Sequence, residues 1–177
     1  MKINRNYGLV FWIEGFSGSG KSTIAELIKK RIEKKYGKTI VLSGDDLRKI
    51  FNFHRYNKKD RIKLSYKTSE FILFLIKNKI NVIYTVVGLN HRARGIYKSK
   101  LKNFFVTLIK ADIMKIKKLG KKNTYARKKN IVGIDIKAEY PRNPDFIIQN
   151  DMKITPYKLA SKYYIDISKK IKNKHNE

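Results

Sequence analysis

Apolar runs of strand length alternate along this chain with segments whose apolar residues recur at helical spacing. The runs predicted as strands are residues 9–13, 39–42, 81–87, 104–109 and 146–149. The segments predicted as helices are residues 22–36, 58–77, 92–101, 112–119 and 156–172. The strands lack polar alternation, which is typical of a parallel sheet covered on both faces. The pattern therefore predicts an α/β fold, a doubly wound parallel sheet of about five strands.

One basic and polar segment, residues 120–142, is longer than most connections in a compact domain. We expect it to act as a lid. The chain of 177 residues is long enough for one domain with a real core and too short for two ordinary ones. The predicted organisation is a single domain over residues 1–177 that contains this lid.

Composition narrows the classes of protein further. The chain has no cysteine, which excludes disulfides, thiolate metal sites and cysteine nucleophiles. It has no apolar stretch of about 18 residues, so we expect a cytoplasmic protein without a membrane partner. The formal net charge of +28 has two interpretations: a nucleic-acid-binding face, or an enzyme whose surface lysines reflect a Lys-, Ile- and Asn-rich background. The lysines are spread through every predicted helix, which favours the second.

The loop between the first strand and the first helix fits the phosphate-binding pattern G-x-x-x-x-G-K-S/T. Glycines let backbone N–H groups turn towards phosphate oxygens, and the helix N-terminus adds its positive dipole. Lys21 is expected to reach the β and γ phosphates of ATP, and Ser22 to ligate Mg²⁺. The ATP-binding residues predicted in this way are Gly15, Ser17, Gly18, Ser19, Gly20, Lys21, Ser22 and Thr23.

Two aspartates follow the second predicted strand, at the edge where the carboxyl ends of parallel strands meet. A kinase needs a group that orients or deprotonates the attacking hydroxyl, and Asp45 is placed to do so and to hold the metal. The alternative is that Asp45 and Asp46 cap a helix that starts near Leu47.

These motifs resemble the adenylylsulfate kinase family, which phosphorylates the 3′-hydroxyl of adenosine 5′-phosphosulfate with ATP and Mg²⁺. The family's G-L-S-G-A/S-G-K-S-T and D-G-D-N-V/I-R are similar to residues 15–23 and 43–48. Its D-R pair, its lid K-N-F-T-G-I-D and part of its Y-E-x-P-x-N-P-E/D are similar to residues 60–61, 129–135 and 138–145.

The resemblance implies that Asp45 is the catalytic carboxylate and that Arg48 and Arg61 bind the acidic 5′ group of the acceptor. It also implies that residues 129–135 close over the acceptor base. The acceptor-binding residues expected are Arg48, Asn52, Tyr56, Arg61, Leu89, His91, Arg92, Lys129, Ile131 and Gly133.

Departures from the family lie on the acceptor side. The family places adenine between two phenylalanines; Tyr56 replaces the first, and Ile131 stands at the second. Leu64 and Ser43 also replace an asparagine and an aspartate of the family. Losing one stacking ring is worth about 1–3 kcal/mol, so adenine should bind less well than in the family.

A smaller pyrimidine fits this pocket better. A branch of the family that acts in bacterial capsule decoration phosphorylates the 3′-hydroxyl of cytidine diphosphoramidate, and the present chain resembles that branch. The alternatives are an adenylylsulfate kinase of sulfate activation, a nucleic-acid-binding or end-processing protein, and an inactive nucleotide-binding regulator. A small nucleotide acceptor, ATP and Mg²⁺ are expected as ligands, and a homodimer as the assembly.

Overall fold

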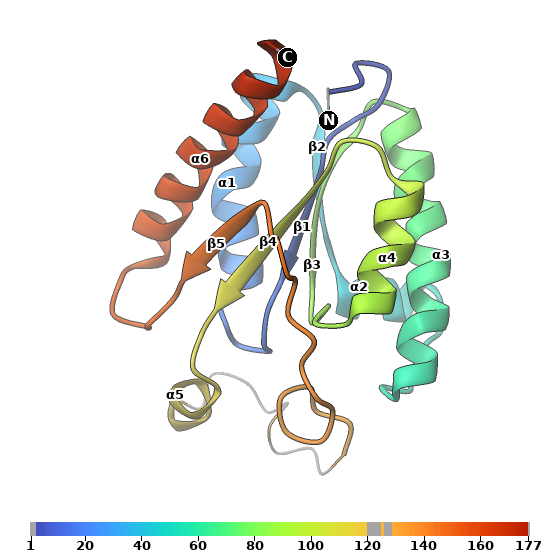
Figure 1. The fold of residues 1–177 in the computed structure, drawn as a ribbon, viewed down its shortest axis with the longest axis vertical. Helices are drawn as coiled ribbons and strands as arrows, with labels where there is room; N and C mark the ends of the chain where they lie inside the picture. The colour runs from blue at the N-terminus through green and yellow to red at the C-terminus, as the bar shows by residue number, and fades with distance from the viewer. Residues whose placement is uncertain (1–2, 120–124, 126–128, 177) are drawn as a thin grey trace.

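A five-stranded parallel sheet forms the centre of the molecule (Figure 1). The computed structural model describes residues 3–119, 125 and 129–176. In that part of the chain the strands lie in the order β2-β3-β1-β4-β5, and every pair is parallel. Their bounds are β1 Val10–Glu14, β2 Thr39–Ser43, β3 Asn81–Val86, β4 Phe104–Lys110 and β5 Phe146–Gln149. All carboxyl ends therefore meet at one edge of the sheet, with β1 in the middle.

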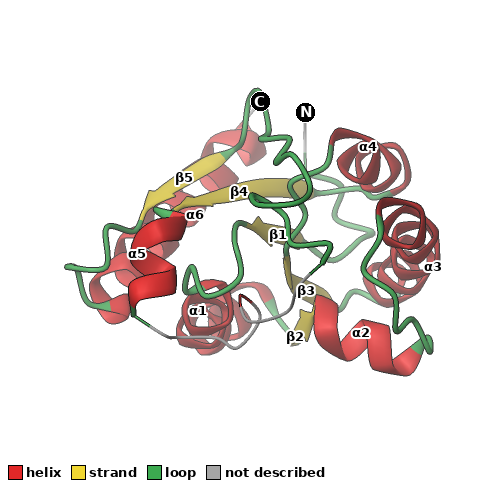
Figure 2. Ribbon diagram, turned by 90° about the horizontal axis from the view of Figure 1, so that it is seen from below, coloured by secondary structure: helices red, strands yellow, loops and turns green. Residues whose placement is uncertain are grey.

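Helices cover both faces of the sheet. Their bounds are α1 Lys21–Tyr36, α2 Gly44–Ile50, α3 Lys58–Lys77, α4 His91–Lys100, α5 Ile113–Lys118 and α6 Pro156–Asn176. α1 and α6 pack side by side on one face, and α3 and α4 on the other (Figure 1). The short helices α2 and α5 lie near the carboxyl edge, as the view onto that edge shows (Figure 2).

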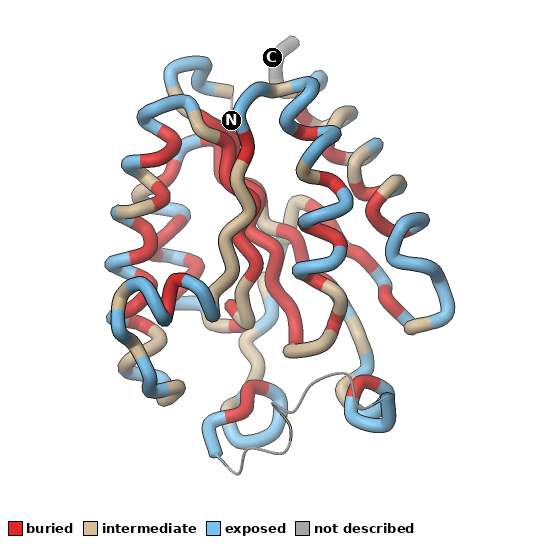
Figure 3. Tube along the Cα trace, turned by 180° about the vertical axis from the view of Figure 1, so that it is seen from behind, coloured by how far each residue is buried: buried red, intermediate tan, exposed pale blue. Residues whose placement is uncertain are grey.

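Side chains of the central strand alternate between the two faces, as the strand geometry requires. Phe11 and Ile13 pack with α1 and α6, whereas Val10 and Trp12 pack with α3 and α4. All four are at most 1% exposed. Figure 3 shows that the centre of the sheet is mostly buried. Fully burying one such side chain contributes roughly 1.5–3 kcal/mol, so these residues hold both helical layers on the sheet.

A third apolar cluster lies at the carboxyl edge. Phe16 of the glycine loop packs there with Leu89, Leu108, Ile116 and Val132. This cluster joins the glycine loop to the part of the expected lid that the structure describes.

The predicted α/β fold is confirmed, with small differences at element ends. β1 extends one residue further and includes Glu14, and α6 continues to Asn176 rather than ending near residue 172. α2 begins at Gly44 rather than near Leu47, because Ser43 is its N-cap and accepts a hydrogen bond from the backbone N–H of Asp46. Of the expected lid, residues 120–124 and 126–128 lie outside the described residues.

Candidate active site

The glycine loop between β1 and α1 has the backbone that a phosphate-binding loop requires. Gly18 and Gly20 have φ angles of 77° and 92°, which favour glycine. Gly20 is the N-cap of α1 and makes no side-chain capping hydrogen bond, so backbone N–H groups and the helix dipole point into the loop. Lys21 is buried, and its Nζ donates to the carbonyls of Gly15 at 3.0 Å and Phe16 at 2.6 Å. The loop thus combines an N-terminal dipole with a fixed ammonium group, as an anion site needs.

Two residues that sequence reasoning missed brace this loop. The Nδ2 of Asn150, directly after β5, donates to the carbonyl of Ser19 at 3.0 Å. The hydroxyl of Tyr125 donates to the carbonyl of Ser17 at 2.7 Å. Asn150 carried a usable signal, because a polar residue at the carboxyl end of a strand lies at the edge where ligands bind.

A cleft of about 1010 Å³ opens at this edge of the sheet. Thirteen of the residues predicted for the site line it. They come from the glycine loop, the helices α1, α2 and α3, the segments before α3 and after β3, and the loop 129–136. They are Ser17, Gly18, Gly20, Lys21, Ser22, Thr23, Asp45, Arg48, Tyr56, Arg61, Leu89, Lys129 and Ile131. The structure therefore brings the predicted nucleotide side and most of the predicted acceptor side into one cavity.

The two aspartates of α2 occupy different environments. Asp45 lies in the first turn and lines the cleft. Asp46 does not line it; its Oδ2 accepts a hydrogen bond from the Oγ of Ser43 at 2.6 Å, which completes the helix cap. A capping role thus fits Asp46, and the position expected of a functional carboxylate fits Asp45.

A basic and aromatic cluster lines the part of the cleft where the sequence predicts the acceptor. The guanidinium of Arg48 lies 4.3 Å from the ring centre of Tyr56, and that of Arg61 lies 5.8 Å from it. Arg61 also donates from Nε to the carbonyl of Tyr56 at 2.7 Å and from Nη2 to the carbonyl of Asn130 at 3.2 Å. Arg61 therefore links the Tyr56 wall of the cleft to the loop that carries Ile131.

Burial and the neighbouring Arg48 lower the pKa of Arg61 to about 10, although Asp45 acts in the opposite direction. Arg61 is thus still charged at neutral pH, and its interaction with Arg48 makes the cluster receptive to an anion. Burial raises the pKa of Tyr84, which also lines the cleft, to about 12, so its hydroxyl stays neutral.

The loop 129–136 folds back on itself beside the cleft. The backbone N–H of Ile131 donates to Asp135 Oδ2 at 2.9 Å, and that of Gly133 donates to the carbonyl of Ile136 at 2.8 Å. Gly133 has a φ of 92°, and a Cβ there would approach Cε1 of Phe16 to 2.5 Å. The glycine is therefore required for packing against the glycine loop. Gly133 is not among the residues that line the cleft, so its predicted contact with the acceptor has no support from this geometry.

Five more predicted residues are not among those that line the cleft. Gly15 and Ser19 are buried behind the loop surface. Asn52 is exposed in a left-handed conformation after α2, with its Oδ1 against His54. His91 and Arg92 are exposed in the first turn of α4, which begins at His91. The predicted acceptor roles of Asn52, His91 and Arg92 thus have no support from this geometry.

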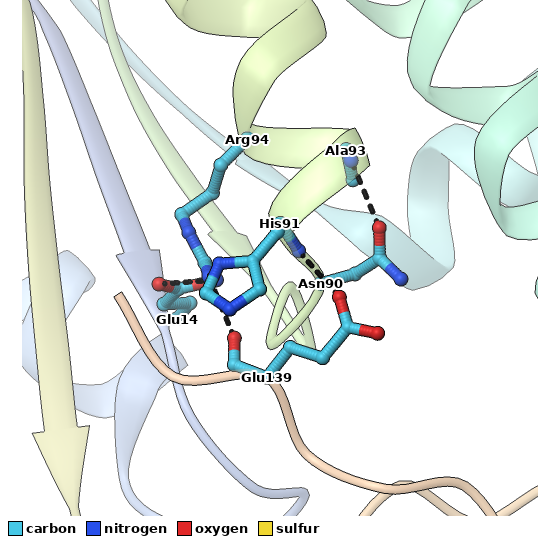
Figure 4. A network of polar contacts seen from close by, with 6 residues as sticks. All are labelled: Glu14, Asn90, His91, Ala93, Arg94 and Glu139. Carbon is cyan, nitrogen blue, oxygen red and sulfur yellow. Dashed lines mark hydrogen bonds and ion pairs between the residues drawn. The ribbon is translucent and has the colours of Figure 1, made fainter. Parts of the chain in front are cut away.

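Sequence reasoning also missed a buried ion pair beside the cleft (Figure 4). Glu14, the last residue of β1, is fully buried and pairs with Arg94 of α4. Burial raises the pKa of Glu14, while the charge and hydrogen bonds of Arg94 oppose that effect. A charged residue at the end of an apolar strand was the available signal, since buried charges require partners.

Comparison with known proteins agrees with this geometry. A model of the adenylylsulphate kinase family matches residues 7–149. The chain belongs to the adenylylsulphate kinase family. It is therefore a P-loop kinase, a phosphotransferase whose acceptor is a hydroxyl group.

Individual relatives cover most of the chain. The cytidine diphosphoramidate kinase of Campylobacter jejuni subsp. jejuni serotype O:2 is 29% identical over 154 residues, which cover 84% of this chain and 90% of the relative. The adenylyl-sulfate kinase of Clostridium kluyveri is 27% identical over 158 residues, which cover 85% of this chain and 79% of the relative. The fold is similar to that of the APS kinase CysC of Mycobacterium tuberculosis in complex with AMPPNP and APS. The alignment with that structure has a TM-score of 0.81 at 23% identity and covers 92% of this chain and 98% of the other.

Two further findings concern the described residues alone. None of their helices is both long and apolar enough to cross a membrane. Among them, no group of three or more His, Cys, Asp or Glu side chains could hold a metal ion.

Proposed function

We propose that this protein transfers the γ-phosphate of ATP to the 3′-hydroxyl of an activated cytidine nucleotide, and that cytidine diphosphoramidate is its acceptor. The observation that carries the proposal is a single cleft lined both by the phosphate-binding loop and by an arginine and tyrosine cluster. A donor with phosphates and an acceptor with an acidic group can meet in such a cleft.

The nucleotide side fits ATP. The uncapped start of α1 offers backbone N–H groups to phosphate oxygens, and Lys21 neutralises charge at their outer end. Asn150 and Tyr125 donate to the carbonyls of Ser19 and Ser17, which fixes the backbone of the loop. We assign these residues to binding and orientation of ATP.

The site also fits Mg²⁺. Ser22 and Asp45 line the cleft and offer the oxygen ligands that this ion prefers, and Mg²⁺ usually takes few ligands from the protein itself. When bound, the ion neutralises charge on the phosphate oxygens of the substrate.

Asp45 is the group that we assign to the acceptor hydroxyl. Its carboxylate accepts the proton of the 3′-hydroxyl as the oxygen forms its bond to the γ-phosphorus and the bond from that phosphorus to ADP breaks. The proton then passes to solvent. Asp45 lies on the short helix α2, whose capped first turn fixes the position of its backbone.

The acceptor side favours a pyrimidine. Tyr56 offers one stacking face, and the loop opposite supplies the aliphatic Ile131, which is 8% exposed. Arg48 and Arg61 present guanidinium donors for the acidic 5′ part of the acceptor. The similarity to the cytidine diphosphoramidate kinase of Campylobacter jejuni supports this assignment and, with it, a role in capsule modification.

A second candidate acceptor is adenylylsulfate. The relatives named adenylyl-sulfate kinase are 26–29% identical to this chain, and the Tyr56 wall of the cleft would still stack on adenine. One aromatic face in place of two should weaken adenine binding by roughly 5- to 150-fold.

The experiment that tests the proposal measures transfer of label from γ-labelled ATP with Mg²⁺ to cytidine diphosphoramidate and to adenylylsulfate. The matched controls are the 3′-deoxy forms of both acceptors. We expect faster transfer to the cytidine compound and none to either 3′-deoxy form. Faster transfer to adenylylsulfate would favour the second candidate, and transfer to neither would refute the proposed function.

A further inference from the structure

A buried carboxylate lies directly beneath the wall of the cleft. Glu14 faces the α3 and α4 side of the sheet because it is two residues after Trp12. Gly88 lines the cleft, and a Cβ at that position would come within 2.6 Å of Glu14 Oε2. Gly15, the first residue of the phosphate-binding loop, follows Glu14 in the chain. Glu14 therefore adjoins both the wall of the cleft and the start of the phosphate-binding loop.

Arg94 makes that contact and extends it (Figure 4). Its Nη1 donates to Glu14 Oε1 at 3.0 Å and to Oε2 at 2.9 Å. Its Nη2 donates to the backbone carbonyl of Glu139 at 2.6 Å and lies 2.8 Å from Nδ1 of His91. A guanidinium group can only donate, so the His91 nitrogen is the acceptor. One planar side chain thus joins β1, the first turn of α4 and the segment that follows the loop 129–136.

Glu139 is held at several further points. Its backbone N–H donates to the carbonyl of Leu89 at 2.9 Å, and its Oε2 accepts from the backbone N–H of His91 at 2.8 Å. Its Oε1 pairs with Lys58 of α3 at 3.3 Å. Ile136, Leu89 and Lys58 all line the cleft. Glu139 therefore attaches the segment after the loop 129–136 to the acceptor side, in addition to the hydrogen bond that Arg61 makes to Asn130 within the loop.

We propose that Arg94 is a positioning residue for phosphoryl transfer. Because it donates hydrogen bonds both to Glu14 and to the backbone carbonyl of Glu139, it fixes the acceptor side of the cleft relative to the phosphate-binding loop. The proposal rests on the proposed function for its effect on the acceptor. Arg94 does not line the cleft, so it acts through Glu139.

Arginine is needed because the three partners lie around one planar fork. A lysine could neutralise Glu14, but its single ammonium group lacks the two separate nitrogens that reach Glu14 and the Glu139 carbonyl at once. Arg94→Lys therefore keeps the charge in the core while it removes the link to the loop. This substitution separates the proposed role from simple neutralisation of a buried charge.

The test compares Arg94→Lys with wild type and with Lys170→Met. The control removes an ion pair of similar length, Lys170 with Asp145 at 2.8 Å, whose two residues do not line the cleft. The quantities measured are the melting temperature, the Kd for ATP, and KM and kcat for cytidine diphosphoramidate. Hydrogen exchange is followed in peptides that cover residues 129–142.

For Arg94→Lys we expect a Kd for ATP close to wild type, kcat/KM for the acceptor about 10- to 100-fold lower, and faster exchange in residues 129–142. Lys170→Met should match wild type in all three. Glu139→Ala should lower kcat/KM less than Arg94→Lys, because Arg94 binds the backbone carbonyl that the alanine retains. If Arg94→Lys does not fold, the double substitution Glu14→Met with Arg94→Met is measured in its place, because it leaves no unpaired buried charge. The expected results are the same.

A folded variant with wild-type kcat/KM for the acceptor would overturn the proposal, and so would equal losses on the ATP and acceptor sides. If wild type transfers phosphate to no acceptor, the proposed function fails. The exchange measurement still decides whether Arg94 holds the loop, and unchanged exchange in residues 129–142 would show that it does not.

Discussion

Replacing Ile131 with phenylalanine should shift the acceptor preference towards adenine nucleotides. The backbone at this position is fixed independently of the side chain: its N–H donates to Asp135, and its carbonyl accepts from Ile134, Asp135 and Ile136. The Arg61 bridge sets the distance from this loop to the Tyr56 wall. A phenylalanine would therefore present its ring to the cleft opposite Tyr56.

The magnitude follows from base stacking. An aromatic side chain contributes about 1–3 kcal/mol per stacked base, or roughly 5- to 150-fold in affinity, and adenine offers more stacking surface than cytosine. Overpacking of this buried position should cost about 1–3 kcal/mol of unfolding free energy. We therefore expect a less stable enzyme whose kcat/KM for adenylylsulfate rises relative to that for cytidine diphosphoramidate.

The assay is the ratio of the two kcat/KM values, measured on protein shown to be folded by circular dichroism. The control is Ile131→Leu, which conserves volume without adding a ring and should leave the ratio unchanged. A folded Ile131→Phe variant with a wild-type ratio, or with a shift towards cytidine, would refute the placement of residue 131 on the base-binding wall.

Three further substitutions test the surroundings of the cleft. Gly133→Ala should destabilise the protein by about 1–2 kcal/mol, a fall of roughly 2–8 °C in melting temperature, because Gly133 has a positive φ. The control Gly95→Ala, at an open position in a helix, should raise the melting temperature. Equal effects of the two substitutions would contradict a backbone requirement for glycine at position 133. Asn150→Leu should lower the unfolding free energy in urea by about 1–3 kcal/mol, since the Ser19 carbonyl loses its donor; an unchanged midpoint would argue against this brace. A backbone N–H at the start of α4 and a lysine of α3 lower the pKa of Glu139 below 4.5. The ionised carboxylate therefore stabilises the fold above pH 4.5, and this contribution is lost as the pH falls further. The difference in unfolding free energy between wild type and Glu139→Gln should shrink below pH 4.5, and a constant difference would exclude the Glu139 carboxylate as a source of stability.

The sequence was sufficient for the features whose signals are local. Apolar runs and helical spacing placed every strand and most helix ends within a residue or two. The glycine loop was recognisable because its residues are consecutive and its strand and helix adjoin it. Asp45 was recognisable because it follows a strand whose carboxyl end must face the cleft.

Features that depend on distant pairing were missed. Glu14 and Arg94 are 80 positions apart, and Asn150 lies 131 positions from Ser19. Only the order of the strands brings such residues together, and neither motif nor periodicity encodes that order. The sequence also could not show that His91 and Arg92 are not among the residues that line the cleft, because the direction of a side chain in the first turn of α4 depends on the residue at which the helix begins. Their acceptor roles stay predictions. The expected homodimer and cytoplasmic location stay predictions.

The most direct test of the proposed chemistry is the rate of phosphate transfer by Asp45→Asn. The amide keeps the size and shape of the side chain but cannot accept the proton of the acceptor hydroxyl as a carboxylate does. The matched control is Asp46→Asn, one residue further in the same turn, where the side chain serves the helix cap. We expect single-turnover transfer to fall roughly 100- to 10,000-fold in Asp45→Asn with the Kd for ATP little changed, and to stay near wild type in Asp46→Asn. Transfer at the wild-type rate in Asp45→Asn would contradict the assignment of this carboxylate to the reacting hydroxyl.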